Sequence, residues 1–198
     1  MIYVSPVRIE VATAPTGLPV SVAQVKERAR MDAGDTMMNA TIEAYIKAVW
    51  KKVEAYTGLA LLQTSFKAYY DSFPVVIAIS KAPKIVVTKL EYIDINGILQ
   101  TLDSSIYQIQ LKKHDFNIFP KSEQKFPDVK RHTTDAVVVS FQAGWSTLIP
   151  DDIKEAILHA VVAMLGNGES KDCFSQCSLP AISKSLLYDY RDVLALMR

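Results

Sequence analysis

The sequence predicts an α+β protein in which helical segments flank a block of short β-strands. Near both ends of the chain, apolar residues recur at the spacing of an amphipathic helix. Between Leu61 and Ala143, short runs rich in β-branched and aromatic residues are instead separated by prolines. We therefore expect a discontinuous helical domain with two N-terminal and two C-terminal helices, residues 1–60 and 146–198. An antiparallel β domain, residues 61–145, is inserted into it.

The chain begins with a segment that is unsuited to a helix. Four helix-breaking residues predict an extended arm over Met1–Pro19, namely Pro6, Pro15, Gly17 and Pro19. Ser21 then has the character of an N-cap, and Gln24 completes a capping box. The first helix is expected over about Val22–Met31.

A second, longer helix is predicted from Thr36 to Thr57. Gly58 follows its last periodic residue, where a left-handed C-cap is least costly. Trp50 lies at the edge of the apolar stripe, in a position where either core packing or an interface with a partner would use it. The stripe itself consists of Met38, Ile42, Tyr45, Ile46, Val49, Val53 and Tyr56.

The central block is expected to contain about seven short strands. Asn96-Gly97 stands between two of the runs and is a strong short-range signal for a β-hairpin. The polar segment Lys121–Thr134 is predicted to be a loop.

The third helix is predicted to begin after Pro150, with Asp151 and Asp152 in its first turn, where the helix dipole favours acidic residues. Leu158, Val162 and Leu165 lie off its main apolar face, so the helix is apolar on nearly all sides and a partner subunit is expected to cover the second side.

A final helix is predicted to begin at Pro180, after a Gly/Ser/Cys loop. Its expected apolar face contains Ile182, Leu186 and Tyr190, with Leu187 and Tyr188 away from that face.

The composition and motifs give no support for an enzyme. The net charge of +1 argues against a strong global attraction to nucleic acid or anionic membranes, and no run of about 18 apolar residues is present to span a membrane. No nucleophile elbow, metal-ligand motif or glycine-rich phosphate loop occurs. Cys173 and Cys177 have no second ligand pair nearby and are interpreted as free thiols. His114-Asp115 is interpreted as part of a polar turn. We expect no catalytic, cofactor or metal site, and a reducing cytoplasm as the place of synthesis.

The order and spacing of five segments resemble the head–tail connector (adaptor) proteins of long-tailed bacteriophages, which also occur in prophages and gene transfer agents. The resemblance extends over about Leu18 to Arg191 and includes a Glu-x-x-Thr-Gly end to the second helix. The segments are LPVSVAQVKERARMD, ATIEAYIKAVWKKVEAYTGLALLQTSF, KLEYIDINGILQTLDSSIYQI, VVVSFQAGWSTLIPDDIKEAILHAVVAML and LLYDYR. The sequence departs from the family pattern at Ala29, where a larger residue is common, and at MLGNGES after the third helix.

The resemblance implies a non-enzymatic structural protein in the neck of the virion, assembled in the host cytoplasm. Such proteins form a twelve-fold ring beneath the portal protein, extend the DNA channel without sequence-specific contacts, and bind the next neck or tail protein. We expect a lateral interface at Trp50, Leu158, Val162 and Leu165. We expect an axial interface with the portal at Leu187, Tyr188, Arg191 and Met197.

Two other functions remain open at this point. One is another neck component, such as a stopper or a tail-completion protein. The other is a small enzyme or ligand-binding protein with its site at the loops of the β domain.

Overall fold

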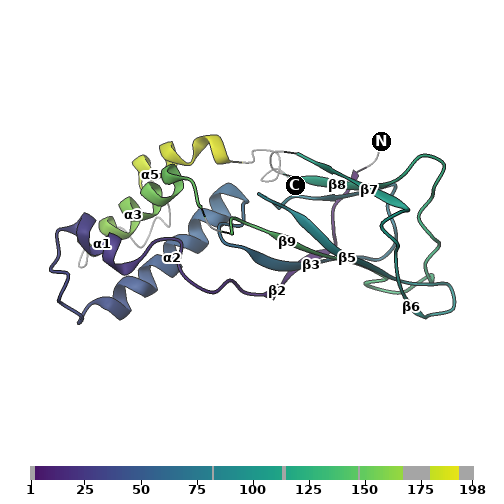
Figure 1. The fold of residues 1–198 in the computed structure, drawn as a ribbon, viewed down its shortest axis with the longest axis horizontal. Helices are drawn as coiled ribbons and strands as arrows, with labels where there is room; N and C mark the ends of the chain where they lie inside the picture. Colours follow the sequence, from purple (N-terminus) through teal and green to yellow (C-terminus); the bar gives the residue numbers. More distant parts are fainter. Residues whose placement is uncertain (1–2, 82, 113–114, 147, 167–178, 192–198) are drawn as a thin grey trace. The chain divides into compact units, whose positions relative to one another are not determined.

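The computed structural model describes residues 3–81, 83–112, 115–146, 148–166 and 179–191. The chain divides into two compact units (Figure 1). The β unit contains residues 1–15 and 62–146, and the helical unit contains residues 16–61 and 147–198. The expected α+β class is therefore confirmed.

The helical unit contains helices from both ends of the sequence. They are α1 (Val22–Ala29), α2 (Asn39–Thr57), α3 (Asp151–Gly166) and α5 (Ala181–Leu186), followed by the 3₁₀ turn η1 (Tyr188–Tyr190). The capping box of α1 is confirmed, because the Ser21 hydroxyl accepts a hydrogen bond from the Gln24 backbone while the Gln24 side chain accepts one from the Ser21 backbone. Helix α2 begins three residues later than the sequence predicts and has no side-chain cap at its start.

The Glu-x-x-Thr-Gly segment has a clear physical role at the end of α2. Gly58 adopts the left-handed conformation, with a φ angle of 77°, and its N–H donates to the Glu54 carbonyl, which confirms the predicted C-cap. The Glu54 carboxylate accepts a hydrogen bond from the Leu61 backbone at 2.8 Å. The Thr57 hydroxyl donates to the Val53 carbonyl and accepts from the Leu59 N–H. The Gly58 N–H therefore satisfies one of the carbonyls that a helix end leaves unpaired, and the two side chains satisfy backbone N–H groups just after the helix.

Helix α3 lies at the centre of the helical unit and contacts α1, α2 and α5. Its fully buried residues include Ile153, Ile157 and Val161, and they pack in a core with the buried α2 residues Ile42 and Ile46. The Ser183 hydroxyl of α5 is also buried, and it donates to the Ala156 carbonyl of α3 at 2.8 Å. Satisfying that hydroxyl offsets the cost of removing it from water.

The β unit consists of two sheets. One has four strands in the order β1-β4-β8-β7, and the other has five in the order β2-β3-β9-β5-β6. All pairs are antiparallel except β1–β4, which is parallel and departs from the all-antiparallel prediction. The strand bounds are β1 Tyr3–Val4, β2 Arg8–Thr13, β3 Thr64–Tyr70, β4 Val76–Ile79, β5 Val86–Ile93, β6 Leu99–Thr101, β7 Tyr107–Leu111, β8 Phe116–Pro120 and β9 Val137–Ala143.

The N-terminal arm belongs to the β unit, whereas its sequence led us to group it with the helices. Strands β1 and β2 each form one of the two edges of their sheets, β2 pairing with β3 and β1 with β4. Pro6 lies between these two strands, where a missing N–H costs no ladder hydrogen bond, so the prolines limit the strands without preventing them.

Aromatic residues join the two sheets into a sandwich. The Phe116 ring of β8 meets the Phe141 ring of β9 edge-on at 5.3 Å between centroids, and Phe141 stacks on Phe66 of β3 at 5.4 Å. All three rings are buried. The Tyr70 hydroxyl of β3 donates to the Ala78 carbonyl of β4, and burial raises the pKa of this phenol. The core of the β unit therefore lies between the two sheets.

The predicted hairpin is present between β5 and β6, with a different turn from the two-residue loop that Asn-Gly often forms. Gly97 has a φ angle of 86° and its N–H donates to the Asp94 carbonyl, while the Asp94 N–H donates to the Ile98 carbonyl. The Asp94 carboxylate also accepts hydrogen bonds from the backbones of Asn96 and Ile98. The turn is consequently fixed by backbone and side-chain contacts together.

Candidate interaction surfaces

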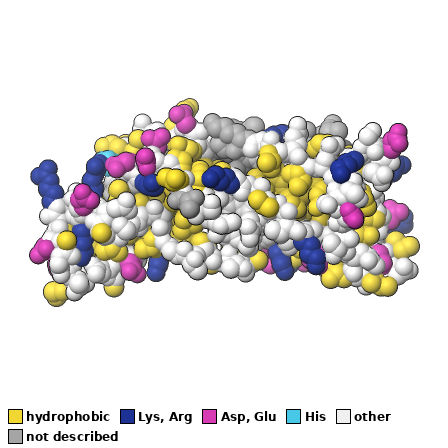
Figure 2. Space-filling view, viewed as in Figure 1, with side chains coloured by type: hydrophobic (Ala, Val, Ile, Leu, Met, Phe, Trp, Pro, Cys, Tyr) yellow, Lys and Arg dark blue, Asp and Glu magenta, His cyan; other side chains and the backbone are white. Residues whose placement is uncertain are grey.

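The described residues contain neither a cluster of ligands that could hold a metal ion nor a helix long and apolar enough to cross a membrane. Figure 2 shows lysine and arginine side chains interspersed with aspartate and glutamate on the face it displays. The surface in this view therefore has no extended region of one charge. The expected free thiols, Cys173 and Cys177, and His114 lie outside the described residues.

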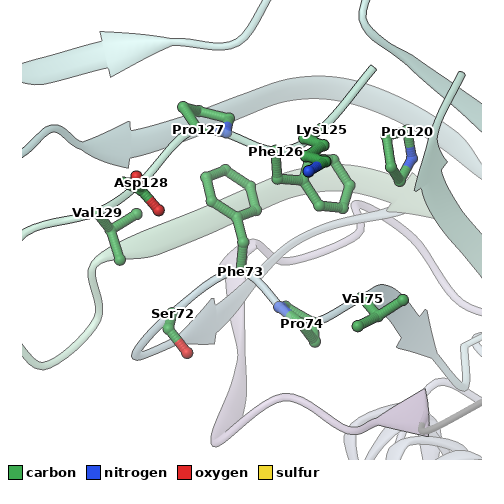
Figure 3. Close-up of a pocket in the computed structure, with 10 residues that line it drawn as sticks. All are labelled: Ser72, Phe73, Pro74, Val75, Pro120, Lys125, Phe126, Pro127, Asp128 and Val129. Atoms are coloured by element: carbon green, nitrogen blue, oxygen red, sulfur yellow. The ribbon is translucent and has the colours of Figure 1, made fainter. Parts of the chain in front are cut away.

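An open hollow of about 470 Å³ lies in the β unit (Figure 3). It is lined by the segment just before β4, by the end of β8 and by the long loop that follows β8. The rings of Phe73 and Phe126 stack at 4.7 Å between centroids on its floor, and Phe73 also contacts Tyr92 of β5. The remaining lining residues are Ser72, Pro74, Val75, Pro120, Lys125, Pro127, Asp128 and Val129. Most of this lining is apolar, so it is better suited to covering by a protein segment than to catalysis.

A polar cluster joins α1 to α3 in the helical unit. The Arg28 guanidinium lies 2.7 Å from His159 Nε2 and 3.2 Å from the Glu155 carboxylate. These two α3 residues are the narrow polar edge of a helix that is otherwise apolar on most sides. The cluster therefore connects α1 to α3, and both Arg28 and Glu155 remain partly exposed, so it contributes little to stability.

The residues expected at a lateral interface have different environments. Trp50 is half-buried, and its indole N–H is shielded from solvent without a hydrogen-bond partner among the described residues. Leu158 is buried within the helical unit, contrary to the expectation that a partner subunit covers it. The small unit has enough helices around α3 to bury Leu158 itself. Val162 and Leu165 are half-buried and remain accessible.

The residues expected at an axial interface also differ in their exposure. Leu187 is fully buried, because it follows Leu179 and Ser183 at helical spacing on the face that contacts α3. Tyr188 is 70% exposed, and Arg191 lies with its guanidinium carbon 5.1 Å from the Tyr56 ring centre. Met197 lies outside the described residues.

The predicted face of the last helix is wrong, since Ile182 is 59% exposed. The spacing of apolar residues favoured Ile182, whereas the hydrogen bond that allows Ser183 to be buried is a tertiary contact.

Sequence reasoning missed a group of exposed apolar side chains at the edges of the β unit. Ile95, Ile98 and Leu99 surround the β5–β6 turn with more than half of each side chain exposed. Leu111 of β7 and Val11 of β2 are exposed to a similar extent. The sequence shows these residues only as parts of apolar runs. The strand order is needed to show that β2, β6 and β7 are edge strands.

Neither a protein-family model nor a curated protein sequence matches this chain. Three solved structures of gene transfer agent particles resemble it over nearly its whole length. A chain in the neck of an empty particle, computed with C6 symmetry, has a TM-score of 0.77, 18% identity, and coverage of 94% of this chain and 96% of that one. A chain in the native virion has a TM-score of 0.75 and 18% identity, with coverage of 93% of this chain and 95% of that one. A chain in the native neck, computed with C12 symmetry, has a TM-score of 0.68 and 17% identity, with coverage of 94% of this chain and 96% of that one. At these identities the likeness establishes a common fold.

Proposed function

We propose that this chain is a structural component of the neck of a phage-like particle, and specifically a head–tail connector that binds beneath the portal as a ring. The observation that carries the proposal is the whole-chain likeness to proteins of gene transfer agent necks. The likeness extends over 94% of the chain, so it includes most of both the helical and the β unit. In this role the chain extends the DNA channel and presents a surface to the next neck or tail protein.

The exposed residues of the helical unit suggest how such a ring is held. Trp50, Val162 and Leu165 are accessible apolar residues that we assign to the lateral interface between copies. Tyr188 and Arg191, at the end of the C-terminal helical segment, we assign to the contact with the portal. Tyrosine and arginine are the residue types that most often dominate interface energies, because they combine a large contact area with directional hydrogen bonds.

Binding to the cognate portal tests this function directly. The purified chain is mixed with portal rings, and bound protein is measured by co-sedimentation for the wild type and for Tyr188→Ala. We expect the substitution to weaken binding at least tenfold, which corresponds to about 1.4 kcal/mol. Ile95→Ala, in the β unit, is a matched control because Ile95 is exposed to nearly the same extent, 67% against 70%. Wild-type protein that does not bind the portal would argue for another neck component.

A further inference from the structure

Strand β7 is an edge strand of the four-stranded sheet, and among the described residues no further strand pairs with its outer side. Lys121 N–H donates to the Ile106 carbonyl, and Lys112 N–H donates to the Asp115 carbonyl. In the antiparallel register of β7 with β8, these bonds place the backbone groups of even-numbered residues toward β8. The N–H and C=O groups of Tyr107, Ile109 and Leu111 therefore point away from the sheet, where a further strand can pair with them.

The same edge exposes side chains that face the inside of the sandwich. Ile109 and Leu111 are in register with Ile118 and Phe116 of β8, which are fully buried, so all four lie on the core-facing side of the sheet. Ile109 is nevertheless 41% exposed and Leu111 60% exposed. Since β7 has neither a proline nor a charged residue to block pairing, an additional strand would both complete the hydrogen-bonding ladder and cover these two side chains.

Edge strands also occur at the other end of the strand order in both sheets. Strands β1 and β2 are joined by three residues, and each is the first strand in the order of its sheet. Strands β7 and β6 are the last strands of the same two sheets. On β2, Val11 is in register with the buried Phe66 and is itself 57% exposed. Among the described residues, each β unit therefore has an unpaired edge strand at both ends of its strand order, as a head-to-tail contact that closes into a ring requires.

We propose that β7 of one copy pairs with β2 of the next copy, so that the β units of neighbouring copies share a continuous sheet. Charge does not oppose a second copy of this chain at the edge. Residues 107–111 are uncharged, and the charges of Arg8 on β2 are engaged within their own chain by Glu10 at 3.4 Å and Asp135 at 2.8 Å. Strands of five and six residues also match in length. This inference rests on the ring assembly in the proposed function and adds a contact in the β unit to the lateral interface of the helical unit.

Disulfide trapping tests the pairing in the full-length chain. In a Cys173→Ser, Cys177→Ser background, Gln108→Cys or Gln110→Cys on β7 is combined with Arg8→Cys or Glu10→Cys on β2, because adjacent strands bring Cα atoms within disulfide range. The double variants are expected to give a ladder of dimers, trimers and larger species on non-reducing gels. Antiparallel pairing predicts that the combinations 108 with 10 and 110 with 8 share one register, and parallel pairing predicts 108 with 8 and 110 with 10.

A second set of variants separates edge pairing from adventitious oxidation. Ile109→Lys with Leu111→Lys in the cysteine background is expected to reduce the ladder at least tenfold, because charged side chains on the core-facing side of an edge prevent strand addition. Val75→Lys is the matched control, an exposed valine outside both edge strands, and should leave the ladder unchanged.

Absence of a ladder at the highest soluble concentration, or dimers formed equally by β7 cysteines alone, would overturn the proposal. If the ladder forms but the chain does not bind the portal, the strand pairing is supported and the connector function is contradicted.

Discussion

Gly144 gives a quantitative test of the β unit, because its position excludes any side chain. A Cβ atom built on Gly144 would lie 2.2 Å from the Leu62 carbonyl oxygen and 2.9 Å from the Gln63 nitrogen, inside the 3.0 Å that real Cβ atoms keep. Relieving this clash in Gly144→Ala moves residues 144–145 away from two other segments, at residue 63 and at residue 83, to each of which they are joined by a hydrogen bond. Gln63 N–H donates to the Trp145 carbonyl at 3.1 Å, and Gly144 N–H donates to the Pro83 carbonyl at 2.7 Å.

The expected cost follows from these contacts. Losing two hydrogen bonds costs about 2 kcal/mol at about 1 kcal/mol each, and an alanine at the φ angle of 111° adds roughly 1–3 kcal/mol of backbone strain. Gly17→Ala provides a matched control, since Gly17 has a φ angle of 113° and a Cβ atom added to it would have nothing within 4 Å, so it should show only the strain.

The assay is thermal unfolding of both variants under the same conditions. Gly144→Ala is expected to lower the free energy of unfolding by about 2 kcal/mol more than Gly17→Ala, which corresponds to a further decrease in Tm of about 4–8 °C. Equal decreases in Tm for the two variants would show that the close approach of Gly144 to Leu62 is not present in solution.

Three further predictions concern the loop after α1, the end of α2 and the β5–β6 hairpin. Lys26→Met should destabilise the helical unit by roughly 1–3 kcal/mol in urea unfolding, because the buried Lys26 ammonium donates to the Ala33 and Asp35 carbonyls and the methionine only fills its space. Glu54→Ala should increase amide hydrogen exchange at Leu61, whose N–H loses its acceptor, while the exposed Glu43→Ala should not. Hydrogen bonds from the Ile98 backbone, above all, hold the pKa of Asp94 below its ordinary value of 3.8, so the hairpin should be stabilised above that pH and lose this contribution as pH falls through the lowered pKa.

These predictions have distinct contradicting results. Unfolding of Lys26→Met at the wild-type urea concentration would show that the lysine does not hold the loop. If the Leu61 amide exchanges no faster in Glu54→Ala, the Glu54 side chain does not stabilise the end of α2, and the Gly58 cap alone does. For the hairpin, Asp94→Asn should remove the acid dependence of the Ile98 amide chemical shift, and an unchanged dependence would assign it to another group.

The sequence predicted those features that depend on local contacts. The capping box at Ser21, the left-handed cap at Gly58 and the position of the β5–β6 hairpin each depend on a few neighbouring residues, and all three are present. The N-terminal arm was misassigned because its strand formation requires β3 and β4, which are far away in sequence. Short strands of this kind are stabilised by their partners more than by their own composition.

The candidate surfaces were less predictable than the fold for the same reason. Periodicity identified Leu158 and Leu187 as apolar residues off the main face of a helix, yet both are buried by neighbouring helices of the same chain. Tyr188 was correctly placed away from the packed face. The open edges at β2 and β7 depend on strand order, which a single sequence does not specify.

The proposed function requires that copies of this chain form a ring beneath a portal, and electron cryomicroscopy of the chain mixed with its cognate portal can observe that ring. We expect a closed ring bound to one end of the portal, with twelve copies as in the C12 symmetry of the similar neck. Tyr188 and Arg191 would lie at the portal contact. Portal rings without added density, or single copies bound elsewhere on the portal, would contradict the proposed function.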